Sequence, residues 1–174
     1  MIHIVLVEPE IPQNTGNIAR TCAATGSRLH LIEPLGFKLE DRYLKRAGLD
    51  YWHMVNVEVH PDLGSLMARW QGYPFYYAST KAKHNYAEVQ YPEDTDIFLV
   101  FGKESRGLPE NLLSRVYDHC IRIPMIEEAR SLNLSNSVAI VTYEVLRQHG
   151  FRGLLQKGDL TGRDEPDGTW MDYV

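Results

Sequence analysis

The sequence predicts an α/β fold, an open and mostly parallel sheet flanked by helices. Short β-rich runs alternate with helical patterns along the chain. The first two helical patterns each end at a glycine, Gly26 and Gly48, as many helices do. The run Ile97–Phe101 is entirely apolar, which is typical of a strand buried on both faces of a parallel sheet.

The N-terminal half is predicted to alternate regularly between strands and helices. Apolar residues at helical spacing indicate each helix, and β-branched or apolar runs indicate each strand. In order, the expected elements are strand Ile2–Val7, helix Thr15–Thr25, strand Leu29–Ile32, helix Leu39–Ala47, strand Met54–Val59 and helix Pro61–Trp70.

The C-terminal half is less regular and ends in the longest helical pattern of the chain. In order, we expect strand Pro74–Ala78, the polar loop Lys81–Thr95, strand Ile97–Phe101, the short helix Pro109–Val116, strand Cys120–Pro124, the loop Ile126–Leu134 and the long helix Ser135–His149. Beyond Gly150 the chain is polar and shows little periodicity. We therefore expect one domain over residues 1–150 and a flexible tail over residues 151–174.

The composition restricts the classes of protein that this chain can be. A formal net charge of −5 argues against indiscriminate binding of nucleic acid, although a basic patch on one face is compatible with that total. Cys22 and Cys120 are too few and too far apart for a zinc site or a redox pair, so we expect two buried thiols. Met1 leads directly into a strand, and no apolar run approaches the roughly 20 residues of a membrane span. We expect a soluble cytoplasmic protein that does not enter a membrane.

Three polar loops that contain glycine or proline are the strongest functional signal. They are residues 9–17 after the first strand, residues 102–109 after the strand Ile97–Phe101, and residues 131–137 before the last helix. A helix N-terminus presents unpaired backbone N–H groups. Loops at the carboxyl ends of strands are where an open α/β sheet binds its ligand. We therefore expect the three loops to converge on one site.

The common nucleotide-binding and metal-binding patterns do not fit. Gly102 and Gly107 have the spacing of a phosphate loop, but Leu108 and Pro109 follow where lysine and serine or threonine would be needed. No Gly-x-Gly-x-x-Gly occurs. The seven histidines show no metal-ligand spacing and are expected to be surface or strand-end residues, so we expect no metal.

Basic residues in two places are candidates for binding phosphate or ribose. Arg20 lies near the sheet-facing side of the first helix or at its margin, where it could bind an anion or form a structural ion pair with an acid such as Glu104. Three basic residues share one face of the predicted second helix: Arg42, Lys45 and Arg46. Lys81 lies in the polar loop. This pattern fits either a solvated surface or a surface that binds an RNA backbone.

The loops resemble the motifs of the SPOUT class of S-adenosylmethionine-dependent RNA methyltransferases. The three motifs are residues 14–20 (NTGNIAR), residues 101–109 (FGKESRGLP), and residues 123–125 (IPM) with 131–136 (SLNLSN). The resemblance covers about residues 1–150. Within the class, the short length and the runs VEPEIP and IEPLGF resemble the minimal members, the tRNA (cytidine/uridine-2′-O-)-methyltransferases, which methylate the ribose of the tRNA wobble nucleotide.

This resemblance implies a C-terminal trefoil knot, a homodimer, S-adenosylmethionine as cofactor and the tRNA anticodon arm as partner. It makes Arg20 the catalytic arginine, accompanied at the catalytic site by Asn14, Glu104, Ser131 and Asn133. It places the cofactor against the main chain of Ala78, Gly102, Ile123, Ser131 and Leu132. Because a guanidinium stays protonated near neutral pH, we expect Arg20 to stabilise the developing alkoxide while a phosphate or water accepts the proton.

The last helix gives an independent reason to expect a dimer. It carries apolar residues around most of its circumference, and a single sheet covers only one face: Val138, Ala139, Val141, Val145 and Leu146. The surplus would pack on a second subunit, with the first helix as the other part of the interface.

Two other functions share these motifs. A catalytically silent, knotted RNA-binding protein would keep the fold, but the intact set of Asn14, Arg20, Glu104, Ser131 and Asn133 favours an enzyme. A ribosomal RNA 2′-O-methyltransferase would keep the chemistry, but the chain shows no separate RNA-binding domain. The sequence therefore favours methyl transfer to tRNA.

Overall fold

The computed structural model describes residues 1–39 and 52–159. The predicted helix Leu39–Ala47 lies outside the described residues except for Leu39 itself. The predicted RNA-binding residues Arg42, Lys45 and Arg46 also lie outside them.

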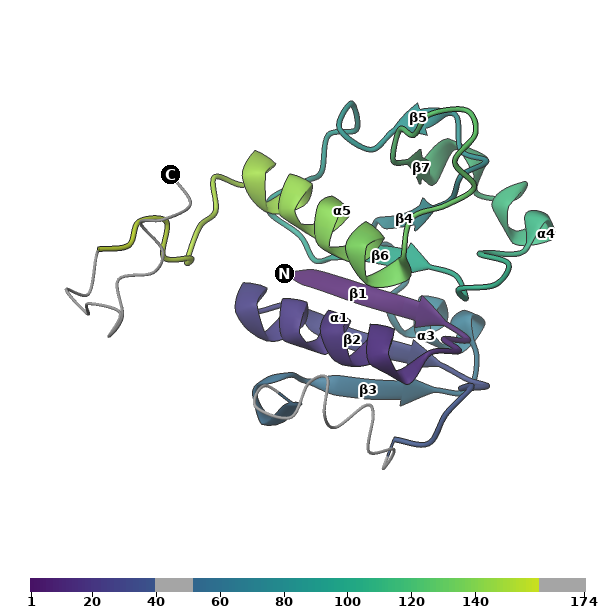
Figure 1. Cartoon of the computed structure of the whole chain (residues 1–174), viewed down its shortest axis with the longest axis horizontal. Coiled ribbons are helices and arrows are strands. Elements are labelled where there is room, and N and C mark those ends of the chain that lie inside the picture. The colour runs from purple at the N-terminus through teal and green to yellow at the C-terminus, as the bar shows by residue number, and fades with distance from the viewer. Residues whose placement is uncertain (40–51, 160–174) are drawn as a thin grey trace, which may run out of the picture.

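Seven parallel strands form one sheet in the order β3-β2-β1-β6-β4-β7-β5, with β1 and β6 near its centre (Figure 1). The strands are β1 (Ile2–Val7), β2 (Arg28–Ile32), β3 (Val57–His60), β4 (Phe75–Ala78), β5 (His84–Asn85), β6 (Ile97–Phe101) and β7 (Cys120–Arg122). The predicted parallel α/β architecture is confirmed.

The helices cover both faces of this sheet. They are α1 (Pro12–Thr25), α3 (Leu63–Arg69), α4 (Glu110–Leu113) and α5 (Leu134–Gln148), with 3-10 turns η1 (Trp52–Met54) and η2 (Tyr117–His119). Helices α1 and α5 lie side by side on one face (Figure 1). Side chains of α3 and α4 join the core cluster on the other face.

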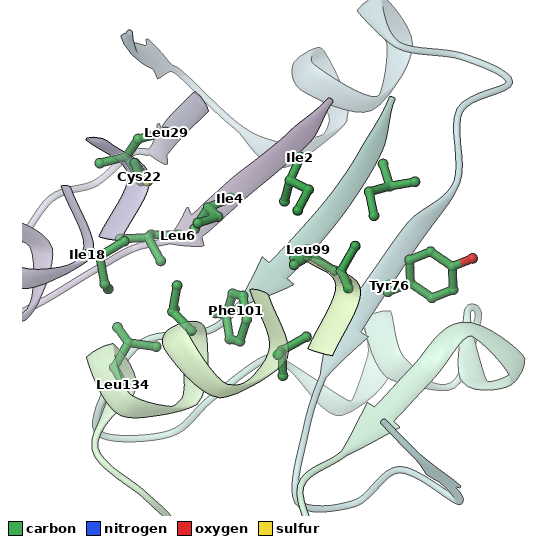
Figure 2. Packing of buried hydrophobic residues seen from close by; sticks show 14 of the residues in the cluster. Ile2, Ile4, Leu6, Ile18, Cys22, Leu29, Tyr76, Leu99, Phe101 and Leu134 are labelled. Atoms are coloured by element: carbon green, nitrogen blue, oxygen red, sulfur yellow. The ribbon is translucent and has the colours of Figure 1, made fainter. Parts of the chain in front are cut away.

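The core forms where apolar strands meet these helices. Every residue of β6 is buried, as predicted for a strand covered on both faces, and so is every residue of β1. Ile4 and Leu99 of the sheet pack with Ile18 of α1 and Leu134 of α5 (Figure 2). Both cysteine thiols are buried and free, also as predicted, and burial raises the pKa of Cys22 to about 12.

Several element boundaries differ from the prediction. Helix α1 begins at Pro12, not Thr15, because proline suits the first turn, where no N–H is needed. The predicted strand Met54–Val59 divides into a 3-10 turn and β3, and the predicted helix at 109–116 shortens to the single turn α4. The polar loop contains the two-residue strand β5, which main-chain pairing with β7 defines. Such pairing has no hydrophobic signature in the sequence.

The end of the described chain continues the packing of α5. Gly150 and Phe151 both have positive φ angles and turn the chain back. Phe151 and Leu154 then pack against the core cluster beneath α1 and α5, whereas Leu155 is 93% exposed. None of the helices within the described residues is long and apolar enough to cross a membrane.

Candidate active site

The three polar loops meet at a cavity of about 540 Å³ beside the carboxyl ends of β4, β6 and β7. The loop after β6 forms one wall, the N-terminus of α5 and the loop before it form another, and Ile11 and Asn14 reach the cavity from the first loop. The convergence expected from the sequence is confirmed. The site is therefore assembled from segments far apart in the chain by the order of the strands.

Gly102 lets the loop after β6 fold tightly on itself. A Cβ atom at this position would lie 2.1 Å from the carbonyl carbon of Gly107 and 2.3 Å from the amide nitrogen of Leu108. Lys103 and Gly107 form an isolated antiparallel bridge, and Gly107 has a φ of 66°. Only glycine at position 102 permits this approach of two backbone segments.

A hydrogen-bond network through Glu104 joins the three loops. The Glu104 carboxylate accepts bonds from the backbone N–H groups of Glu10 (2.8 Å) and Ile11 (3.2 Å) and from Asn14 Nδ2 (3.0 Å). Asn14 Oδ1 in turn accepts from Asn133 Nδ2 at 3.0 Å. The three residues that the sequence assigned to different loops thus form one connected network.

Asn133 has a second role as the N-cap of α5. Its Oδ1 accepts from the backbone N–H groups of Ser135 (2.8 Å) and Asn136 (3.4 Å), and also from Ser135 Oγ. The side chain therefore uses its oxygen for the helix and its nitrogen for Asn14. The orientation of this amide fixes the start of α5 relative to α1.

Two further contacts close the first loop on the second. The Glu10 carboxylate accepts from Ser105 N–H and Ser105 Oγ, both at 2.9 Å, and these hydrogen bonds lower the pKa of Glu10. Glu8 forms an ion pair with Lys103 at 2.6 Å. These contacts could not be predicted from the sequence, because alternating acids in VEPE resemble an ordinary solvated loop.

The predicted cofactor residues all line the cavity, and so do most of the predicted catalytic residues. Lining residues among these two sets are Asn14, Ala78, Gly102, Glu104, Ile123, Ser131, Leu132 and Asn133. Lys81 also lines it and forms an ion pair with Glu110. Met125 of the third motif also lines the cavity, and so do Thr80 and Arg130, which were not predicted as site residues. Thr80 follows the end of β4 and Arg130 lies in the loop before α5, and neither position has another signal in the sequence.

Arg20 is the exception among the predicted catalytic residues. It does not line the cavity of its own chain, and its side chain is exposed. The expectation that it lies near the sheet-facing side of α1 or at its margin is wrong, because Arg20 is exposed and Ile18, Ala19 and Cys22 fill the buried side. Arg20 therefore lies on the exposed side of the helix.

The expectation that the histidines are surface or strand-end residues is wrong for His3 and His30, which lie inside β1 and β2, whereas His60 does end β3. His3 and His30 are fully buried, and His60 is 8% exposed. They belong to β1, β2 and β3, which are neighbours in the sheet although they are distant in sequence. A search for short ligand spacings cannot detect such a cluster.

Comparisons with known proteins agree with this architecture. A tRNA (cytidine(34)-2′-O)-methyltransferase of Methylovorus glucosotrophus is 49% identical over 154 residues, which cover 88% of this chain and 99% of that protein. A solved structure described as "Structural insights into the 2-OH methylation of C/U34 on tRNA" has a TM-score of 0.82 at 44% identity and covers 87% of this chain and 98% of the other.

A more distant neighbour is the AdoMet-bound rRNA methyltransferase of Sinorhizobium meliloti. Its TM-score is 0.74 at 25% identity, and the match covers 84% of this chain and 56% of that one. Residues 1–143, which contain most of the described fold, match the SpoU rRNA Methylase family. With this match and relatives near 50% identity over almost their whole length, the chain belongs to the SpoU rRNA Methylase family.

Proposed function

We propose that this protein transfers a methyl group from S-adenosylmethionine to the ribose 2′-hydroxyl of the wobble nucleotide, cytidine or uridine 34, of a tRNA. The observation that carries the proposal is the network from Glu104 through Asn14 to Asn133, which holds three loops around one cavity. Relatives that cover nearly the whole chain are tRNA (cytidine(34)-2′-O)-methyltransferases. A neighbour with AdoMet bound supports the choice of cofactor.

The cavity suits S-adenosylmethionine in size and chemistry. Its volume lies within the range of roughly 300–1,000 Å³ that is common for small-molecule sites. Apolar side chains such as Ile121 and Leu108 lie beside exposed loop backbone, which can bind a nucleoside without a phosphate-binding glycine motif. Ala78, Gly102, Ile123, Ser131 and Leu132 would hold the cofactor through their main chain. When bound, it supplies the methyl group on a sulfonium centre.

The chain's own residues would contribute alignment and electrostatics. Glu104 and Asn14 position the first loop, and Asn133 positions the start of α5, so their effect on the reaction is to fix geometry. Arg20 would donate hydrogen bonds to the ribose oxygen as negative charge develops there. A phosphate of the tRNA or a water molecule would accept the proton, because a guanidinium stays protonated.

A homodimer would complete this site, because Arg20 lies outside the cavity of its own chain. We place the interface on the outer surfaces of α1 and α5. The apolar residues first proposed for it are mostly committed within the chain, since Val138, Val141 and Val145 are fully buried and Leu146 is 7% exposed. Helix α5 instead offers three less buried residues to this interface. Ala139 and Ile140 are half-buried, and Tyr143 is 46% exposed.

Three finer features belong to the same proposal. The crossing of the cavity loops before α5 is proposed to be a trefoil knot, as in the class that the motifs resemble. Residues 1–150 are proposed as the methyltransferase domain, although the packing of Phe151 and Leu154 favours a limit a few residues later. The anticodon arm is proposed to contact Lys81 and the segment that contains Arg42, Lys45 and Arg46, in a cytoplasmic protein whose chemistry requires no metal.

A transfer assay tests the function directly. Purified protein would receive methyl-labelled S-adenosylmethionine with an unmodified tRNA transcript bearing cytidine or uridine 34, or with a ribosomal RNA fragment. We expect label in the tRNA only. Arg20→Ala should abolish transfer while cofactor affinity stays within a few-fold, and Arg115→Ala, which changes another exposed arginine, should leave both unchanged. Binding of tRNA without transfer would identify a silent RNA-binding protein, and labelled ribosomal RNA would identify the alternative enzyme.

A further inference from the structure

Three buried histidines form a continuous row on the sheet face that α3 covers. His3 Nδ1 lies 2.8 Å from His30 Nε2, and His30 Nδ1 lies 3.0 Å from His60 Nε2. The ring of Phe98 stacks on His3 with centroids 4.3 Å apart. The neighbouring parallel strands β1, β2 and β3 set this row, because each contributes one histidine to the same face. The proposed methyl transfer does not use these three histidines.

The acid at one end of the row sets the protonation of the rings. Asp96 Oδ2 lies 3.4 Å from His3 Nε2. An ionised carboxylate can only accept hydrogen bonds, so it favours a protonated nitrogen opposite it. In the tautomer that places the proton of His3 on Nε2, facing this carboxylate, His3 Nδ1 accepts the Nε2–H of His30. His30 Nδ1 is left with a lone pair.

The lone pair of His30 faces two further metal-binding groups. One nitrogen each from His30 and His60 and one oxygen from Glu58 all lie within 4.8 Å of one another. Two histidines and one glutamate are a common ligand set for zinc, with a fourth position open to water. Two nitrogens bound at 2.0–2.1 Å to a tetrahedral ion are about 3.3 Å apart. His30 Nδ1 and His60 Nε2 lie 3.0 Å apart here, so the two rings need to separate only slightly to bind an ion.

We propose that His30, His60 and Glu58 form a binding site for a divalent transition-metal ion such as Zn²⁺. His3 and Asp96 serve this site as outer partners, because a metal-bound histidine usually donates its other N–H to a group that fixes its orientation. None of the three ligands lines the methyl-transfer cavity. The site is therefore separate from the proposed reaction and can be tested without it.

A competing cation already contacts the site. Arg69 Nη1 forms an ion pair with Glu58 Oε2 at 3.0 Å, and the Arg69 side chain is 60% exposed. A metal ion must displace this guanidinium, which can move into solvent. Removing Arg69 should therefore strengthen metal binding, an effect that a purely structural histidine row does not predict.

The bound ion would fix the end of β3 relative to the first loop. The carbonyl oxygen of His60 accepts from Glu33 N–H at 3.0 Å, and the segment that follows brings Gly36 N–H to the carbonyl oxygen of Pro9 at 2.9 Å. An ion on His60 would therefore stabilise the chain that supports the first loop.

Titration of the untagged full-length chain with Zn²⁺ alone, followed by calorimetry, tests the site. We expect one ion per chain, and with Co²⁺ we expect absorption bands of a tetrahedral nitrogen and oxygen site without thiolate charge transfer. His60→Ala and Glu58→Gln should each weaken Zn²⁺ binding at least tenfold, whereas Arg69→Ala should strengthen it. The double variant His53→Ala with His119→Ala, which removes two exposed histidines, should bind as the unchanged chain does.

The proposal is overturned if the unchanged chain binds no Zn²⁺ at micromolar concentration. It is also overturned if His60→Ala and Glu58→Gln bind as tightly as the unchanged chain, or if the surface control loses binding to the same extent. Circular dichroism shows whether each variant folds. Should His60→Ala fail to fold, Glu58→Gln decides alone, because Glu58 lies at the rim, 23% exposed.

Discussion

Asn133 Nδ2 donates a hydrogen bond to Asn14 Oδ1 across 3.0 Å, although the two residues are separated by 119 positions. The bond joins the first turn of α1 to the N-cap of α5. Because Asn14 also donates to Glu104, a change at any one of these residues should reach the other two loops.

Asn133→Asp separates the two roles of Asn133. An aspartate still caps α5, but it cannot donate to Asn14 and it brings a second negative charge toward Glu104. We expect kcat/KM for methyl transfer to fall about tenfold or more, consistent with the loss of roughly 1–2 kcal/mol of alignment. Thermal unfolding should change little. A large fall in Tm with unchanged activity per folded molecule would assign Asn133 to capping alone.

Gly102→Ala tests the tight loop after β6. The added Cβ would meet backbone atoms at 2.1–2.5 Å, and these cannot move as a flexible side chain would. We expect cofactor binding by calorimetry to be lost or weakened by more than tenfold, because the loop that forms one wall must open. Gly158→Ala is the matched control, since nothing lies within 4 Å of its added Cβ. Equal affinity of both variants for S-adenosylmethionine would refute this role.

The Glu10–Ser105 contact predicts a pH dependence of stability. Hydrogen bonds from Ser105 lower the pKa of Glu10 below its ordinary value of 4.5, so the unfolded chain binds this proton more readily than the folded chain. The stabilisation is therefore complete above about pH 4.5 and is lost as the pH falls through the lower folded pKa. Urea unfolding should show Glu10→Gln less stable at pH 7 and nearly equal at low pH. Exposed Glu127→Gln should show no such pH-dependent difference in the free energy of unfolding. If Glu10→Gln were less stable than the unchanged chain by the same free energy at every pH, the mechanism would be contradicted.

Tyr143→Arg tests the proposed dimer without disturbing the core. Tyr143 is 46% exposed on α5, so an arginine there leaves the monomer packed but places charge in the proposed interface. Light scattering should show a monomer, and methyl transfer should fall with the dimer population. Leu155→Arg, at a 93% exposed position, should change neither. A fully active monomeric Tyr143→Arg would show that one chain suffices.

Hydrophobic patterning predicted most of the fold because the strands near the centre of the sheet are almost entirely apolar. The all-buried runs of β1 and β6 and the glycine after α1 could be recognised directly. Strand β5 could not, because main-chain pairing with β7 defines its two residues. Helix α4 was overpredicted because Pro109 marks a helix start, and nothing in the sequence shows that one turn follows.

The candidate site was partly predictable for a similar reason. Loops at strand ends can be located from sequence, and Asn14, Gly102 and Asn133 do meet at the cavity. Arg20 was misplaced because the outer surface of α1 cannot be distinguished by composition from its margin. The histidine row was missed because its members become neighbours only through the strand order β3-β2-β1. Hydrophobic periodicity predicts which residues are buried, but it does not predict which buried residues contact one another.

Mapping of the reaction product by mass spectrometry tests the proposed function most directly. An unmodified tRNA transcript would be incubated with the protein and S-adenosylmethionine, digested, and compared with a transcript that carries 2′-deoxyribose at nucleotide 34. We expect one added methyl group on the ribose of nucleotide 34, and none on the deoxy substrate. A methyl group on a base or at another nucleotide, or equal methylation of the deoxy substrate, would contradict wobble-ribose methylation by this protein.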